Sequence, residues 1–221
     1  MSQVIELVLF DLDGTLVDTA PDLAAAANRM RARRGLAPLP LDVLRPVASH
    51  GARGLLGAAF DVHPSAPDFA QWTDEFLNEY AQGLCVQSRL FEGMDEVLHT
   101  LQARSLRWGV VTNKVARFTQ PLMHALGLHT RAACVVSGDT TPYAKPHPAP
   151  LLHALMLCQV SASAAIYVGD DERDIQAGRA AGLRTVGVRY GYLGSANPPE
   201  AWGADRWADT PAEVLELILP R

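Results

Sequence analysis

The sequence predicts an α/β protein, a doubly wound parallel sheet with an inserted helical cap domain. Short apolar segments rich in β-branched residues alternate with helical patterns along most of the chain. The segments carry apolar residues on both faces, as expected for strands that helices cover on both sides of a parallel sheet. One block breaks the alternation, because residues 17–88 show helical periodicity and no convincing strand.

Each element follows from its own local pattern. Apolar runs bounded by polar or glycine residues predict strands over residues 4–10, 107–111, 133–137, 165–169 and 184–188. The stretches between them predict helices over 94–104, 115–126, 148–158 and 172–180. After a loop at 197–199, Thr210 is placed to cap a last helix over 211–219.

The inserted block contains four predicted helices that prolines separate from one another, over residues 22–34, 41–47, 52–60 and 69–85. In α/β sheets, ligands bind at the carboxyl ends of the strands. An insertion directly after the first strand would lie over that edge as a lid. We therefore expect a core domain of residues 1–16 and 89–221 and a helical cap domain of residues 17–88.

Composition limits the classes of function. The chain has 221 residues, of which 48% are hydrophobic and 19% charged, so a large buried core is expected and general disorder is not. With 24 acidic against 19 basic residues, the net charge of −5 argues against nucleic acid as a partner. No apolar run approaches the roughly 20 residues that span a bilayer, so no membrane partner is expected.

The apolar stretch at residues 4–10 lacks the basic start and the cleavage site of a signal peptide. The 3 cysteines include no Cys-x-x-Cys pair and indicate reduced thiols. We therefore expect a cytoplasmic protein, either a monomer or a homodimer. Among the 19 basic residues only Lys114 and Lys145 are lysines, and both follow predicted strands.

Acidic residues follow the first and the fourth predicted strands. Asp11 and Asp13 leave the first strand two residues apart, and Asp170 and Asp174 lie one helical turn apart after the fourth. An Asx-rich turn and an acidic first helical turn are the plain alternatives. Together, however, these carboxylates would repel one another unless a hard cation such as Mg²⁺ joins them, and oxygen ligands without His or Cys suit that ion.

Polar and basic residues follow the second and third predicted strands. Thr112 and the backbone amide of Asn113 could hold an anionic oxygen at a strand-to-helix turn, although Thr is also a common helix cap. Lys145 stands before Pro146 in a proline-rich connection, where a solvated loop lysine is the alternative. Brought to one sheet edge, these groups and a divalent cation would accommodate a dianionic phosphate.

At this point the sequence resembles the haloacid dehalogenase (HAD) superfamily of phosphotransferases. The resemblance covers the whole chain and includes four motifs in order: residues 11–15 (Asp-Leu-Asp-Gly-Thr), Thr112, Lys145 with Pro146, and residues 169–174. The helical insertion matches the cap of the type I subfamily. The chain resembles the phosphoglycolate phosphatase group in particular. Residues 49–53, 170–171 and 189–192 are similar to its branch of N-acetylmuramic acid 6-phosphate phosphatases.

The resemblance implies a Rossmann-like core and a Mg²⁺-dependent phosphomonoesterase with a small-molecule phosphomonoester substrate. It implies Asp11 as the nucleophile that forms an aspartyl-phosphate and Asp13 as the general acid and base. Thr112, Asn113 and Lys145 would bind the phosphate. The metal ligands would be Asp11, Asp170 and the backbone carbonyl of Asp13, with Asp171 and Asp174 in an outer layer.

The cap is expected to select the substrate. His50, Gly51 and Arg53 are candidates for contacting its non-phosphate end, because a guanidinium binds a carboxylate well. Phosphoglycolate and N-acetylmuramic acid 6-phosphate both carry a carboxylate, so Arg53 does not separate them. An exposed cap arginine is the alternative. A sugar phosphomutase, a silent binding module on the same fold and a dehalogenase are the rival functions that this fold could also carry.

Overall fold

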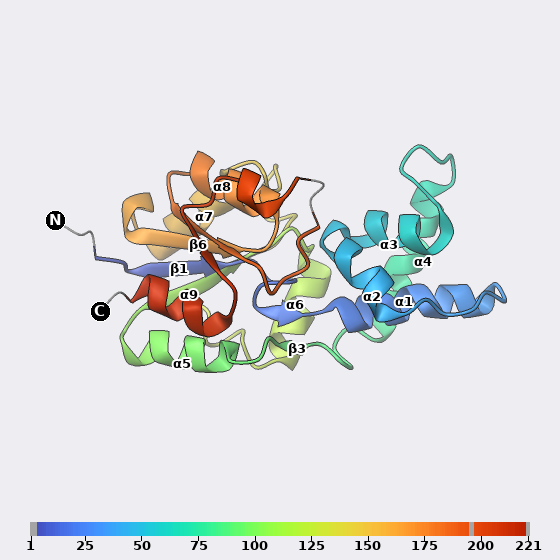
Figure 1. Ribbon diagram of the computed structural model, residues 1–221, viewed down its shortest axis with the longest axis horizontal. Helices are drawn as coiled ribbons and strands as arrows, with labels where there is room; N and C mark the ends of the chain where they lie inside the picture. The colour runs from blue at the N-terminus through green and yellow to red at the C-terminus, as the bar shows by residue number, and fades with distance from the viewer. Residues whose placement is uncertain (1–3, 195–196, 220–221) are drawn as a thin grey trace.

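The computed structural model describes residues 4–194 and 197–219 as a parallel sheet with helices on both faces and a group of helices at one end (Figure 1). The strand order is β5-β4-β1-β6-β7-β8, and every pairing is parallel. The strands are β1 Leu7–Phe10, β4 Arg107–Val111, β5 Val135–Val136, β6 Ala165–Gly169, β7 Arg184–Val188 and β8 Arg206–Ala208. The predicted doubly wound parallel sheet is confirmed.

The two faces of β1 pack into different apolar clusters because successive side chains point to opposite sides of a strand. Val8 and Phe10 join the cluster under α5 (Met94–Ala103), α6 (Ala116–Ala125) and α9 (Pro211–Ile218). Leu7 and Leu9 join the cluster under α7 (Ala149–Cys158) and α8 (Glu172–Ala180). Both clusters are sealed from water. This explains why the strands read as continuously apolar.

The helices of the inserted block lie together beyond the carboxyl edge of the sheet (Figure 1). They are α1 Ala20–Arg33, α2 Leu41–Leu44, the 3-10 helix η1 Arg45–His50, α3 Gly51–Phe60 and α4 Phe69–Gln82. These helices share a third apolar cluster, to which Met30, Leu55 and Phe76 belong and which Phe118 of α6 joins. None of the helices in the described part of the chain is long and apolar enough to cross a membrane.

Some predicted boundaries were wrong. β1 starts at Leu7 rather than at residue 4, because Val4 lies beyond the sheet and is 79% exposed. The predicted strand 133–137 shortens to the two residues of β5. The predicted helix 41–47 divides into α2 and η1, where Pro46 has no backbone N–H for an α-helical bond. The last predicted cap helix ends at Gln82, before Gly83.

Three strands were missed. β2 (Val17–Asp18) pairs antiparallel with β3 (Arg89–Leu90) where the chain enters and leaves the inserted block. This pair corrects the expectation that residues 17–88 contain no strand. β8 has only three residues. Segments this short show no periodicity and exist because a neighbouring strand supplies their hydrogen bonds.

Candidate active site

Three buried carboxylates meet at the carboxyl ends of the two central strands. Asp11 follows β1, Asp170 follows β6, and Asp174 lies one turn into α8. One carboxylate oxygen from each lies within 4.8 Å of the others, and none of the three residues is more than 9% exposed. Chain connections leave β1 and β6 toward opposite edges of the sheet, the place where α/β proteins bind ligands.

Lys145 ties two of these carboxylates together. Its Nζ lies 2.9 Å from an Asp11 oxygen and 2.7 Å from Asp174 Oδ1. It also donates to the Tyr167 hydroxyl at 2.7 Å and to the Val111 carbonyl at 3.1 Å. Burial alone would lower the pKa of this ammonium, but the charges of Asp11 and Asp174 outweigh burial and raise it. Lys145 is therefore a fixed buried cation and not a solvated loop residue.

The cluster holds more negative than positive charge. Three carboxylates face one ammonium, and burial, partly offset by Lys145 and reinforced by Asp174, raises the pKa of Asp11 to about 7. Burial, reinforced by Asp11 and Asp174, also raises the pKa of Asp170 well above its usual range. Buried like charges are stable only when a cation or a proton compensates them. A set of oxygen donors alone fits a hard divalent cation.

The loops around Asp170 approach it closely. Thr15 Oγ1 and the Tyr192 backbone amide each donate to its carboxylate at 2.8 Å. A side chain at Gly14 would collide with the Asp170 carboxylate, and one at Gly191 would collide with Asp170 Cβ. Gly14 also has a φ of +86°, which other residues rarely adopt. These glycines allow two loops to hold the carboxylate in one orientation.

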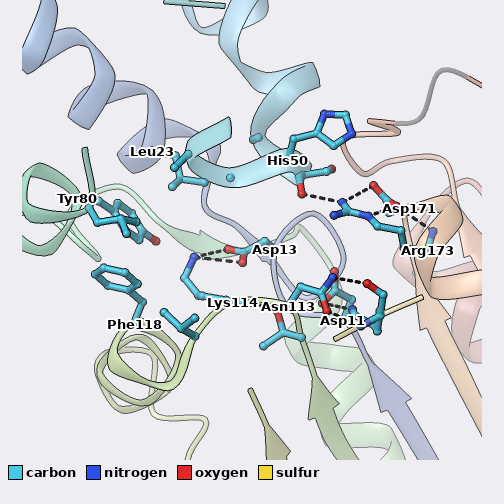
Figure 2. Close-up of a pocket in the computed structure, with 18 of the residues that line it drawn as sticks. Asp11, Asp13, Leu23, His50, Tyr80, Asn113, Lys114, Phe118, Asp171 and Arg173 are labelled. Carbon is cyan, nitrogen blue, oxygen red and sulfur yellow. Dashed lines mark hydrogen bonds and ion pairs between the residues drawn. The ribbon is translucent and has the colours of Figure 1, made fainter. Parts of the chain in front are cut away.

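Asp13 lies apart from the three clustered carboxylates. Its two oxygens lie 3.0 and 3.1 Å from Lys114 Nζ, and it accepts a hydrogen bond from Thr19 Oγ1. Figure 2 shows its carboxylate directed at Lys114 rather than at Asp11. The sequence places Asp13 beside the site, whereas its ion pair with a residue 101 positions away is a tertiary feature.

The predicted phosphate-binding residues lie beside Lys145. Thr112 is 2% exposed, and its Oγ1 accepts a hydrogen bond from the Lys114 amide at 3.2 Å. The Asn113 side chain donates to the Lys145 carbonyl and accepts from the Lys145 amide, both at 2.9 Å. This reciprocal pair joins the loop after β4 to the segment carrying Lys145, so the side chain of Asn113 has a structural task as well.

Asp171 and Arg173 connect the core to the inserted helices. Asp171 caps α8 and accepts two hydrogen bonds from the Arg173 guanidinium, at 2.7 and 2.8 Å. The same guanidinium donates to the Ser49 carbonyl of η1 at 2.8 Å. Burial, followed by the nearby charge of Arg173, lowers the pKa of His50 and favours its neutral form. Nothing in the sequence around Arg173 signals this bridge.

A cavity of about 300 Å³ lies between the carboxyl edge of the sheet and the inserted helices. Its floor contains Asp11, Asp13, Thr112 and Lys145, and its lining also includes Asn113, Asp171 and Asp174. His50 and Gly51 of the inserted block line it too. Arg53 is exposed on α3 and does not line it, so substrate contact by Arg53 stays a prediction.

The cavity has two different walls (Figure 2). Arg173 and His50 form a polar wall, and apolar and aromatic side chains form the other. The apolar wall includes Leu23, Phe76, Leu77, Val115 and Phe118, with Tyr80 beside them. These residues belong to helices far apart in the sequence, and the packing of Tyr80 of α4 against Phe118 of α6 brings them to one cavity.

Comparisons with known proteins agree with this geometry. The model of the haloacid dehalogenase-like hydrolase family matches residues 8–188. An N-acetylmuramic acid 6-phosphate phosphatase from Pseudomonas putida is 44% identical, with 96% of this chain and 95% of the relative covered. A phosphoglycolate phosphatase from Xanthomonas campestris is 43% identical, with 95% and 94% covered. The crystal structure of a predicted phosphoglycolate phosphatase from Haemophilus somnus superposes with a TM-score of 0.84 at 30% identity, covering 97% of this chain and 98% of that one.

Proposed function

Because this chain belongs to the haloacid dehalogenase-like hydrolase family, we propose that it is a Mg²⁺-dependent phosphomonoesterase that works through an aspartyl-phosphate. The observation that carries the proposal is the buried group in which Lys145 holds both Asp11 and Asp174. A carboxylate nucleophile and a fixed cation then lie at one point, at the floor of a cavity. A module that only binds ligands would have no need for this costly arrangement.

The chemistry takes two steps. A carboxylate oxygen of Asp11 attacks phosphorus in line, and the phosphorus–oxygen bond to the substrate breaks while Asp13 gives its proton to the leaving oxygen. Water then attacks the phosphorus and gives a proton to Asp13. The bond between phosphorus and Asp11 breaks, so phosphate is released and Asp11 is regenerated. Thr112, the Asn113 amide and Lys145 hold the phosphoryl oxygens, and their fixed positions stabilise the charge that develops there.

The metal would be held by the carboxylates of Asp11 and Asp170 and by the backbone carbonyl of Asp13. Asp174 contacts Lys145, and Asp171 caps α8. Both would orient the inner ligands, a contribution that commonly matters for metal affinity. When bound, Mg²⁺ supplies positive charge beside the phosphoryl oxygens and offsets the excess of carboxylates.

We propose that residues 17–88 act as the cap domain that selects the substrate, a small phosphomonoester carrying a carboxylate. The first candidate is 2-phosphoglycolate. N-acetylmuramic acid 6-phosphate is the second, and the size of the cavity, about 300 Å³, and its aromatic wall favour it. A sugar ring with acetyl and lactyl methyl groups would cover that wall, whereas glycolate would leave most of it in contact with water.

The test is phosphate release from a panel of phosphomonoesters with Mg²⁺, comparing kcat/KM for the two candidate substrates. The Asp11→Asn protein should lose nearly all turnover and form no adduct with BeF₃⁻. Asp61→Asn, a change at an exposed residue, is the control. An Asp11→Asn protein as active as the parent would contradict the mechanism, and conversion to an isomeric sugar phosphate would indicate a mutase.

We also propose that the enzyme acts in the cytoplasm as a monomer or homodimer. All three cysteines are free, and Cys134 and Cys158 are buried. Reducing compartments keep such thiols unpaired. Size-exclusion chromatography with light scattering would determine the oligomeric state.

A further inference from the structure

Lys114 is a buried cation that the proposed chemistry does not use. Its side chain is 8% exposed, lines the cavity and contacts both oxygens of Asp13. Two hydrogen bonds to its carbonyl, from the Gly138 amide and from Thr119 Oγ1, fix its backbone. Burial alone would lower the pKa of this ammonium, but Asp13 opposes that effect and raises it, so Lys114 keeps its charge.

The ion pair conflicts with the task of Asp13. A general acid must reach the leaving oxygen, yet Lys114 and Thr19 hold the Asp13 carboxylate where it lies. The carboxylate also points at Lys114 in Figure 2 and not toward Asp11. Asp13 must therefore leave Lys114 before it can act, and another anion must replace it, because an unpaired buried ammonium is costly.

The surroundings of Lys114 show what that anion would be. The ammonium lies 4.8 Å from the centre of the Tyr80 ring, which belongs to α4. The Tyr80 hydroxyl is buried and interacts with the Lys114 ammonium, but among the described residues nothing accepts a hydrogen bond from it. A carboxylate at this place would accept from both Lys114 and Tyr80. Phe118 and Leu23, on the same wall, would contact the apolar atoms next to the carboxylate.

We propose that Lys114 and Tyr80 bind the carboxylate of the substrate, which displaces Asp13 from Lys114 and frees it to act at the leaving oxygen. In the structure Asp13 occupies the position that the substrate's carboxylate takes. This inference rests on the proposed function and names the substrate class of that site, phosphomonoesters with a second, carboxylate anion.

The mechanism makes the carboxylate matter for turnover as well as for binding. A substrate without one leaves Asp13 paired with Lys114, so kcat falls together with kcat/KM. Binding through a charge-assisted pair supports a preference of roughly 10- to 100-fold in kcat/KM for the acid over its neutral counterpart. A lysine that served only to support the fold would not discriminate between the two substrates.

The experiment compares two matched pairs of substrates. N-acetylmuramic acid 6-phosphate is set against N-acetylglucosamine 6-phosphate, which lacks only the lactyl ether, and 2-phosphoglycolate against ethyl phosphate. In Lys114→Met the ratio of kcat/KM, acid over neutral, should fall to near one for the preferred pair. Lys114→Arg should keep most of the ratio, and Tyr80→Phe should lose part of it. If Lys114→Met fails to fold, two measurements still test the proposal. They are the ratio in Tyr80→Phe and the difference in kcat between acid and neutral substrates with the parent enzyme.

Arg45→Met is the matched control, because Arg45 forms a 2.7 Å ion pair with Asp18 yet does not line the cavity. Its ratio should equal that of the parent. An unchanged ratio in Lys114→Met would overturn the proposal. A ratio that falls to near one in Arg173→Met alone would also overturn it, because the substrate's carboxylate would then bind at the polar wall. Hydrolysis of p-nitrophenyl phosphate, whose leaving group needs little acid catalysis, distinguishes failure of the proposed function from failure of this inference. A parent enzyme that releases phosphate from none of these substrates refutes the proposed function, whereas an active parent whose Lys114→Met variant keeps the ratio refutes only this inference.

Discussion

Replacing Lys145 with arginine should abolish most turnover although the charge is kept. The Lys145 ammonium is enclosed by Asp11, Asp174, the Tyr167 hydroxyl and the Val111 carbonyl, all at 2.7–3.1 Å. A guanidinium is larger and planar, so it cannot occupy that position without moving its neighbours. Overpacking of this kind typically costs about 1–3 kcal/mol of stability. Displacing one donor from the phosphoryl oxygens typically lowers kcat by about 10²–10³-fold.

The assay measures kcat at saturating Mg²⁺ and substrate for the parent, Lys145→Arg and Lys145→Met, with Tm recorded for each protein. Lys145→Met leaves the buried carboxylates without their cation and should destabilise by about 3–5 kcal/mol, more than the arginine variant. Near-parental turnover in Lys145→Arg would refute the argument from size. A larger loss of stability in the arginine variant than in the methionine variant would contradict the argument from charge.

Three further results are expected. Asp22→Asn should lower the free energy of unfolding by about 2–3 kcal/mol in urea titrations, because the buried Asp22 accepts bonds from three consecutive backbone amides that precede β3; an unchanged midpoint would contradict this. Gly14→Ala should raise the Mg²⁺ concentration needed for half-maximal activity at least tenfold, since the added methyl would collide with Asp170; parental Mg²⁺ dependence would show that the loop can move. Because burial raises the pKa of Asp11 from 3.8 to about 7, protonation stabilises the metal-free fold below pH 4, and this stability is lost as pH rises through 7. In EDTA, Tm should therefore be higher at pH 5.5 than at pH 8, and Mg²⁺ should raise Tm more at pH 8; a Tm in EDTA that rises with pH would refute this.

Most of the fold could be predicted because its signals are local. β4, β6 and β7 have the predicted bounds, since each is mostly apolar and buried on both faces after its first residue. Thr210 caps α9 as predicted. The two-residue pair β2 and β3 could not be found this way, because its only support is the partner strand.

The position of Asp11, Asp13 and Asp170 at strand ends, and of Lys145 in the loop that follows a strand, could be predicted from the sequence by itself. Parallel strands carry their carboxyl ends to one edge, so residues that follow them must converge there. What lies around that edge was decided only by the tertiary structure. The contact of Arg173 with the inserted block spans 124 positions, and no local pattern encodes it.

The two lysines show most clearly what the sequence determines and what depends on the tertiary structure. Sequence position alone placed both near the proposed phosphate site, and a compact ammonium suits that place. Only folding gives them separate partners, Asp11 and Asp174 for Lys145 and Asp13 for Lys114. The physical reason is that strand ends are set by short-range apolar patterning, whereas the partner of a buried charge depends on which distant side chain the packing brings within about 3 Å.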